Sequence, residues 1–349
     1  FTEPELLIGN HCFLRIEQMS EIQKGKIKLF ACGGGGINIG AKLQNHVTKG
    51  AVGFGDLEVV FIDTSRSNLE QAIDQKACYL IEGLDGSGKV RSENHQEIGQ
   101  HIRDILQTHK PGEVNLVLST AAGGSGSVIA PSLVSELLSR EIPVIVLTIG
   151  NADTRLETEN TLKTLKSYEA IAKMRKAPVV MSYVQNDENA TRQTNDARIS
   201  YVIMALCSLY SRQNKELDSK DLFNFLRFDR VTSFQPMLAS LTLLSAADGD
   251  DIFSGLNQLG HIISVASVVR SDQSPKLPMR PEYQCTGFLP SDADSVLQGS
   301  VPMHFVTSDG VFHQVATQLQ KLIDEMEETR NARVHKSGLL GNGDRPTET

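Results

Sequence analysis

The sequence lacks the features that mark membrane, exported and metal-stabilised proteins. Its longest apolar runs, such as residues 143–149, are too short to span a bilayer. Residues 1–26 carry acidic side chains where a signal peptide would have an apolar core. The five cysteines are odd in number and scattered without metal-ligand spacing, which argues against a zinc site and a disulfide framework. We therefore expect a cytoplasmic protein that does not bind a membrane.

Positive charge is also scarce. The chain has 34 lysine and arginine residues against 42 aspartate and glutamate residues, and its formal net charge is −8. This balance argues against a general surface for nucleic acid, so we expect no direct nucleic-acid binding. With 349 residues, of which 40% are hydrophobic and 22% are charged, the sequence is typical of a globular protein with two packed domains.

Two glycine-rich segments each follow a strand-like run and precede a helix-like pattern. They consist of Gly33, Gly34, Gly35 and Gly36, followed by Asn38, and of Gly123, Gly124, Ser125, Gly126 and Ser127. Glycine lets the backbone approach a charged ligand, and the N-terminus of the next helix offers unpaired N–H groups and the positive end of a dipole. Two such segments in one fold predict a polyphosphate that is held from both sides.

Apolar, strand-like runs alternate with helix-like patterns through the first half of the chain. Strands are expected at residues 26–31, 57–62, 114–118 and 143–149, with helices at 39–47, from Asn94 until Pro111, and through 133–138. Because strands that are apolar on both faces need cover on each side, this pattern predicts a parallel sheet between two layers of helices. Ligands of such sheets bind at the carboxyl ends of the strands.

The second half of the chain has a different pattern. Residues 195–211 are apolar nearly all round, which predicts a buried helix between two domains. Strand-like runs follow at 237–244, 261–269, 284–289 and 301–306, and a helix with an apolar stripe runs from Val311 to Met326. We therefore expect an N-terminal extension at 1–25, a nucleotide-binding domain at 26–190, a central helix and loop at 191–230, a second domain at 231–331, and a flexible tail at 332–349.

Two familiar nucleotide motifs are matched only in part. Residues 83–90 have the spacing of a P-loop, but Val90 stands where a hydroxyl should bind Mg²⁺. A polar turn, or a third loop that touches phosphates through Gly86 and Ser87, remain as interpretations. No dinucleotide G-x-G-x-x-G register fits the first glycine segment, because Asn38 falls where its last glycine should be. An oxidoreductase that uses NAD or FAD is kept as an alternative.

Two carboxylates, Asp218 and Asp221, stand three residues apart before an apolar helix pattern. One interpretation is structural, with Asp218 as the N-cap of the helix and Asp221 at its third position. The other is functional, with both carboxylates polarising a water or holding a metal-bound water. The spacing alone leaves both open.

Taken together, these residues resemble the tubulin and FtsZ superfamily of GTP-dependent filament proteins. Residues 123–127 are similar to its G-G-[TS]-G-[TS] signature, and residues 33–42 resemble its first phosphate loop and helix start. The resemblance extends over residues 26–331 and is most specific in the first domain. It implies an α/β fold of the tubulin/FtsZ type, with a parallel-sheet GTPase domain, a buried central helix, a second α+β domain with a mixed sheet, and a C-terminal helix and tail.

The resemblance also implies roles for individual residues. GTP or GDP would be held, with Mg²⁺ bound mainly through the phosphates and not by protein side chains. Asp218 and Asp221 would be catalytic and would complete the site of the neighbouring subunit. Thr191 stands where an aromatic usually stacks on guanine, so stacking would be weaker or supplied elsewhere. Besides the two glycine segments, the implied nucleotide contacts are Asp63, Ser65, Gly86, Ser87, Asp153, Thr154, Glu157 and Asn160, with Asn186 and Asn195 at the base.

Compact length, divergent loops and a short tail are most similar to the phage-encoded tubulins. That likeness implies head-to-tail filaments in the cytoplasm of an infected bacterium, where they position phage DNA or its replication compartment. It also implies that the tail, with Leu339 and Leu340, docks on the adjacent subunit. A GTP-binding regulator of the same family that does not polymerise is a further alternative.

Overall fold

The structure is a computed structural model, and it describes most of the two predicted domains. The described residues are 25–46, 54–70, 72, 74–84, 95–214, 216–245, 261–269, 277, 280–288, 302–308 and 310–336. Residues 1–24 of the predicted extension, Gly86 and Ser87 of the P-loop-like segment, the capping residue Asn94, and the tail from residue 337 lie outside these ranges.

Ten described strands form one sheet in the order β3-β2-β1-β4-β5-β6-β7-β10-β8-β9. All pairs from β3 to β7 are parallel, β10 is antiparallel to both β7 and β8, and β8 is parallel to β9. The expected parallel sheet and the expected mixed sheet are thus both present and are continuous. The strands are β1 (Lys26–Cys32), β2 (Asp56–Asp63), β3 (Cys78–Leu80), β4 (Val114–Thr120), β5 (Val144–Asn151), β6 (Val179–Asn186), β7 (Leu238–Ser245), β8 (Ile262–Val269), β9 (Tyr283–Phe288) and β10 (Pro302–Thr307).

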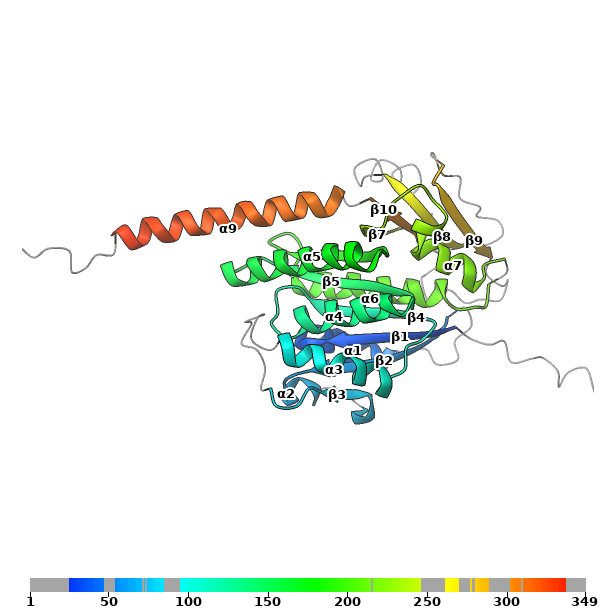
Figure 1. Ribbon diagram of the computed structural model, residues 1–349, viewed down its shortest axis with the longest axis horizontal. Coiled ribbons are helices and arrows are strands. Elements are labelled where there is room, and N and C mark those ends of the chain that lie inside the picture. The colour runs from blue at the N-terminus through cyan, green and yellow to red at the C-terminus, as the bar shows by residue number, and fades with distance from the viewer. Residues whose placement is uncertain are drawn as a thin grey trace, which may run out of the picture.

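Helices cover both faces of the sheet (Figure 1). The alternation of side chains along β1 decides which residues meet which layer. Leu29 and Ala31 belong to the core that α1 and α6 complete, whereas Phe30 and Cys32 belong to the core of α3, α4 and α5. The helices are α1 (Gly33–His46), α2 (Arg66–Leu69), α3 (His95–Thr108), α4 (Gly126–Ser139), α5 (Arg155–Arg175), α6 (Arg192–Leu209), α7 (Ser219–Leu226) and α9 (Gly310–Lys336), with single turns η2 (Gln75–Ala77) and η3 (Phe228–Arg230).

The buried central helix is confirmed as α6. Ile199, Ile203 and Leu206 have no exposed surface, and the helix lies between β6 and β8 on one face of the sheet. It begins at Arg192, three residues before the predicted start, because the hydroxyl of Thr191 accepts a hydrogen bond from the backbone N–H of Thr194 and caps the helix. Within the part of the chain that the structure describes, no helix is long and apolar enough to cross a membrane.

The last helix, α9, is longer than the sequence predicted. Phe312, Leu319 and Ile323 anchor its first half beside α5, and the helix then projects past the other described elements (Figure 1). Pairs one turn apart, such as Lys321 and Glu325 with 3.5 Å between nitrogen and oxygen, support its exposed face. Residues 332–336 therefore continue the helix, and assigning them to the tail was wrong.

A histidine lies in the core of the mixed sheet. His304 on β10 is 2% exposed and is paired with Leu243 of β7 and Ala266 of β8. Burial lowers the pKa of His304 from its ordinary 6.5 to about 4, and the backbone of Ala266 offsets part of this shift. The folded protein therefore keeps this imidazole neutral over a pH range in which an unfolded chain would protonate it.

We expect acid to destabilise the protein through His304. As the pH falls below about 6.5, His304 becomes protonated in the unfolded chain but stays neutral in the folded chain. The free energy of unfolding is therefore lower by about 2 kcal/mol at about pH 5 than at neutral pH. Urea unfolding of the wild type and of His304→Leu at about pH 7.5 and about pH 5 would measure this. The stability of the wild type relative to the variant should fall by that amount. An equal loss in both proteins would contradict the prediction.

Candidate functional site

The two glycine segments meet at the carboxyl ends of β1 and β4. Gly33 has a φ of +72°, and a Cβ placed on it would lie 2.8 Å from the Cα of Gly126. A Cβ on Gly126 would lie 2.6 Å from the carbonyl oxygen of Cys32. Side chains at either position would push the segments apart, so the two segments lie in direct contact.

The first glycine segment is part of a helix. We expected a turn before a helix at 39–47, but Gly33, Gly34, Gly35 and Gly36 already form the first turn of α1. The turn lies directly on β4, since a Cβ on Gly36 would approach the carbonyl oxygen of Leu118 to 2.6 Å. Tertiary contact overrides the low helix propensity of glycine here.

The N-termini of α1 and α4 consequently point to one place at the edge of the sheet. Each helix has 14 residues and no acidic side chain in its first turn, and the Ser125 side chain makes no capping hydrogen bond to α4. The Ser127 hydroxyl donates to the carbonyl oxygen of Gly124 at 3.0 Å and shapes the second segment from within. Of the remaining residues expected at this site, Asn38 lies half-buried in α1, and Gly123 lies half-buried between β4 and α4. Unpaired N–H groups and two helix dipoles make this edge suited to an anion.

The turn after β2 braces the second glycine segment. The buried Asp63 carboxylate accepts hydrogen bonds from the Thr64 backbone at 2.7 Å and from the Asn68 side chain at 2.6 Å. Burial raises the pKa of Asp63, and the bond from Asn68 offsets part of that rise. The Thr64 hydroxyl lies 2.6 Å from the Ser125 hydroxyl, while the Ser65 hydroxyl faces Ser67 at 3.0 Å. Asp63 thus orders the loop, with both oxygens already bonded.

Asn68 is a residue of this site that the sequence did not reveal. A Cβ on Gly34 would lie 3.0 Å from its side-chain nitrogen, so Asn68 packs directly against the first turn of α1. Its helix, α2, has only four residues and therefore no apolar periodicity that could signal it.

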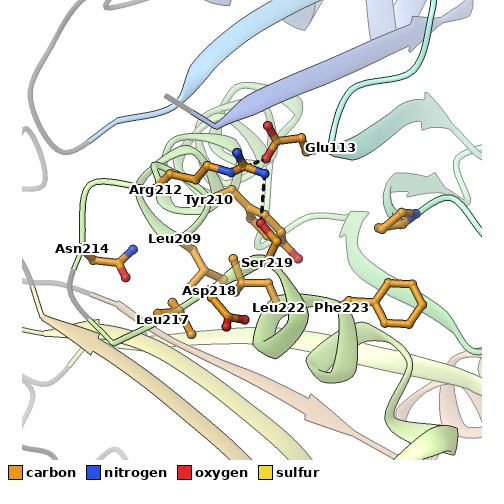
Figure 2. A pocket seen from close by; sticks show the side chains of 11 residues that line it. Glu113, Leu209, Tyr210, Arg212, Asn214, Leu217, Asp218, Ser219, Leu222 and Phe223 are labelled. Atoms are coloured by element: carbon orange, nitrogen blue, oxygen red, sulfur yellow. Dashed lines mark hydrogen bonds and ion pairs between the residues drawn. The ribbon is translucent and has the colours of Figure 1, made fainter. Parts of the chain in front are cut away.

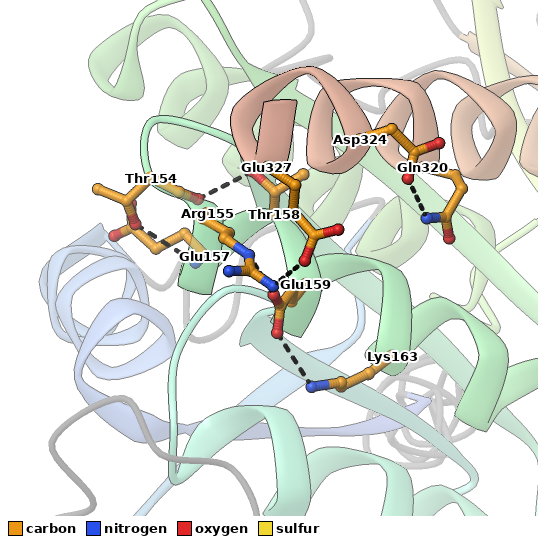
Figure 3. A network of polar contacts seen from close by, with 9 residues as sticks. All are labelled: Thr154, Arg155, Glu157, Thr158, Glu159, Lys163, Gln320, Asp324 and Glu327. Atoms are coloured by element: carbon orange, nitrogen blue, oxygen red, sulfur yellow. Dashed lines mark hydrogen bonds and ion pairs between the residues drawn. The ribbon is translucent and has the colours of Figure 1, made fainter. Parts of the chain in front are cut away.

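The segment expected to contact a ribose has mixed roles (Figure 3). Thr154 caps α5 by accepting from the Glu157 backbone at 3.3 Å, and its hydroxyl donates to the Glu157 carboxylate at 3.0 Å. Asn160 is buried and donates to the carbonyl oxygen of Ala122 at 3.2 Å, which supports the second glycine segment. Asp153 and Thr154 are exposed at the carboxyl edge of β5. A ligand could reach Asp153 and Thr154, whereas Glu157 and Asn160 act within the fold.

The two asparagines expected at the base lie together. Asn195 is fully buried in the first turn of α6, and its amide donates to the Asn186 side chain at 2.9 Å and to the Gln185 carbonyl oxygen at 2.8 Å. Asn186 ends β6 and is half-buried. Thr191, the position expected for an aromatic, is the N-cap of α6 and is exposed.

Asp218 and Asp221 form a capping box at the start of α7, which confirms the structural interpretation of their spacing. Asp218 accepts from the backbone of Lys220 at 2.7 Å and of Asp221 at 2.9 Å, and Asp221 accepts from the backbone of Asp218 at 3.1 Å. Hydrogen bonds from the backbone N–H of Asp221, which has the larger effect, and of Lys220 lower the pKa of Asp218. This exposed carboxyl is therefore ionised at neutral pH.

These two acids lie at the edge of the sheet opposite to the glycine segments. Figure 2 shows Asp218 and Ser219 in one pocket with Glu113 and Arg212. Arg212 and Glu113 form an ion pair, with 2.7 Å between Nε and Oε2. Glu113 directly precedes β4, whereas Gly123 and Gly124 follow the carboxyl end of that strand. The 7 residues of β4 separate the two edges by about 20 Å. The acids therefore cannot reach a ligand bound at the glycine segments of their own chain.

Comparison with known proteins decides the family. No family model matches the sequence. The phage tubulin-like protein of Pseudomonas phage PhiPA3 is 31% identical over 221 residues, which are 63% of this chain and 67% of that protein. The chain belongs to the phage tubulin-like proteins. A second phage tubulin-like protein, from Pseudomonas phage phiKZ, is 28% identical over 221 residues, which are 60% of the present chain and 65% of the phiKZ protein.

Solved structures show that this phage tubulin-like protein has the tubulin-like fold we expected. A phage tubulin PhuZ with GDP superposes with a TM-score of 0.76 at 21% identity, covering 93% of this chain and 95% of that one. A protofilament of TubZ from bacteriophage PhiKZ gives a TM-score of 0.74 at 24% identity, with the same coverage of 93% and 95%. Family and fold together favour a tubulin-like protein over the oxidoreductase alternative.

Proposed function

We propose that this phage tubulin-like protein binds GTP at the carboxyl edge of its sheet and hydrolyses it when a second copy stacks head to tail. The observation that carries the proposal is the separation of the glycine segments from Asp218 and Asp221 on opposite edges of the sheet. Stacking two copies brings the acids of one to the phosphates on the other. Such a contact does not close on itself, and repeating it builds a filament.

Binding in this proposal uses three parts of the carboxyl edge. Backbone N–H groups of the glycine segments at α1 and α4 hold the phosphates. Asp153 and Thr154, which are exposed at this edge, would contact the ribose. Asn186, whose side chain accepts a hydrogen bond from the buried Asn195, would meet the base. The PhuZ structure with GDP supports a guanine nucleotide, since that protein shares this fold. Because Thr191 supplies no ring, affinity depends more on the phosphates than on base stacking.

Catalysis in this proposal is electrostatic. Asp218 is ionised, so with Asp221 it orients and polarises the attacking water near the γ-phosphate of the neighbouring copy. Among the described residues no three His, Cys, Asp or Glu side chains are grouped as a metal site requires. Mg²⁺ would be bound mainly through phosphate oxygens, as the resemblance implies, and when bound it would neutralise their charge. Loss of the γ-phosphate then weakens the contact between copies.

We assign the parts of the chain accordingly. Residues 26–190 form the nucleotide-binding domain, 191–230 the central helix and catalytic loop, and 231–331 a second domain that holds the catalytic loop. The PhiKZ TubZ protofilament supports assembly of copies in a row. The tail would dock on the adjacent copy. In the cytoplasm of an infected bacterium such filaments would position phage DNA or its replication compartment.

The test is phosphate release measured against protein concentration. We expect turnover per subunit to rise steeply with concentration, because an isolated subunit holds no complete site, and we expect GTP to drive the protein into the pellet on centrifugation. Turnover that stays flat from dilute to concentrated solution would overturn the shared site. GTP binding with no pellet at any concentration would instead identify a regulator that does not polymerise, and NAD or FAD binding an oxidoreductase.

A further inference from the structure

We propose that the hydroxyl of Tyr283 is a positioning group for Asp221, a role that rests on the proposed function. Tyr283 is the first residue of β9, the last strand of the described sheet. Its hydroxyl lies 3.2 Å from the Asp221 carboxylate oxygen Oδ1 and 3.2 Å from the Asp221 carbonyl oxygen. A strand 62 residues away in the sequence thus touches one of the two catalytic acids.

The two oxygens of Asp221 are held from different directions. Oδ2 accepts the backbone N–H of Asp218 and belongs to the capping box, while Oδ1 faces Tyr283. The terminal torsion of an aspartate is soft, so one hydrogen bond leaves the carboxylate free to turn. The second bond, from a strand, fixes the plane of the carboxylate relative to the sheet.

Tyr283 has itself a fixed position. The next residue back, Glu282, accepts the Ser233 backbone N–H at 2.7 Å, and Cys285 lies with its sulfur 3.9 Å from the Asp221 carbonyl oxygen on the same face of β9. At the other end of α7, the buried Ser264 hydroxyl donates to the Phe225 carbonyl oxygen at 2.9 Å. Strands β8 and β9 therefore hold both ends of α7, and the mixed sheet sets the orientation of the acid.

This arrangement predicts an effect on turnover and not on GTP binding. The GTP that Asp221 serves is bound by another copy, and the glycine segments of its own chain lie at the opposite edge of the sheet. Removing the hydroxyl loosens Asp221 while the aromatic ring stays in place. A lost hydrogen bond to a carboxylate corresponds to roughly a tenfold fall in kcat.

The experiment compares Tyr283→Phe with Tyr79→Phe in the full chain at a protein concentration that supports assembly. Tyr79, on the edge strand β3 at the other end of the sheet, also donates its hydroxyl to a carboxylate, that of Asp104, and is a matched control. We expect Tyr283→Phe to lower kcat for GTP about tenfold with KM changed less than about twofold, and Tyr79→Phe to change neither. If Tyr283 had only a structural role, Tyr283→Phe would lower the unfolding temperature or raise KM through poor assembly, and kcat would not fall selectively.

A double variant separates failure of this inference from failure of the proposed function. In an Asp221→Asn background, Tyr283→Phe should cause no further loss of hydrolysis, since the two groups act as one unit. If Asp218→Asn and Asp221→Asn both hydrolyse GTP like the wild type, the proposed function fails. If only Asp221→Asn does so, the positioning role of Tyr283 fails alone. If Asp221→Asn loses hydrolysis and Tyr283→Phe keeps the wild-type kcat, or if both variants add independently, the positioning role of Tyr283 fails alone.

Discussion

Asp218→Asn is expected to hydrolyse GTP about 10²- to 10⁴-fold more slowly than the wild type while unfolding at the same temperature. Asparagine caps helices as well as aspartate does, so the variant keeps the bonds to the backbone of Lys220 and Asp221 and loses only the charge. Phosphate release from assembled protein and thermal unfolding would be measured side by side. Filaments of the variant should persist after the GTP supply ends.

Asp218→Ala is the companion variant, because it removes the cap together with the charge. We expect it to hydrolyse GTP as slowly as Asp218→Asn and to unfold at a lower temperature. If Asp218→Asn and Asp221→Asn both release phosphate at the wild-type rate, the two acids serve α7 only as a capping box. Nucleotide binding should be unchanged in every one of these variants, since the glycine segments lie at the other edge.

The second large effect is expected from Gly33→Ala. Alanine at a φ of +72° costs about 1–2 kcal/mol, and its methyl group would meet the backbone of Gly126 at 2.8 Å, which adds about 1–3 kcal/mol of strain. Separating the two glycine segments also spreads the N–H groups that would hold phosphate. We expect destabilisation of about 2–5 kcal/mol in urea and loss of GTP binding in a fluorescence titration.

Gly99→Ala provides the control for this prediction. Gly99 lies inside α3, and no atom stands within 4 Å of the Cβ that an alanine would add. The same chemical change should therefore stabilise the protein by about 0.5–1 kcal/mol and leave GTP binding as it is. Wild-type GTP affinity in Gly33→Ala would show that close contact of the segments is not required for the site.

The sequence carried the parts of the fold that depend on local pattern. The apolar runs at β1, β4 and β5 predicted a buried parallel sheet, and their order placed both glycine segments at one edge. The Asp218 and Asp221 spacing predicted the cap of α7. Among the longer elements, α5 was treated only as a ribose segment, and β6 was not identified although Asn186 at its end was. The short elements α2 and β3 were not predicted either. The helix α9 extends beyond the apolar stripe from which it was predicted, and the ion pair between Lys321 and Glu325 lies on its exposed face.

Other features depend on contacts that no local pattern reveals. Gly35 and Gly36 lie directly against Thr120 and Leu118 of β4, and the hydrogen bond from Asn68 to Asp63 needs a helix of only four residues. Threonine at position 191 is a typical helix N-cap, but in the sequence we considered this position only as one that lacks an aromatic side chain. The bond from Tyr283 to Asp221 spans 62 residues and is set by the order of strands at the far end of the sheet.

The opposed edges of the sheet have a consequence for any row of copies. In the proposed filament, a row of n protomers would contain n − 1 complete sites. At one tip a pocket would face solvent with no carboxylates opposite it, and at the other tip the two carboxylates would face no nucleotide. The triphosphate in the open pocket would be free to exchange and would not be hydrolysed. The rates at which protomers add to and leave the filament would therefore differ between the two tips.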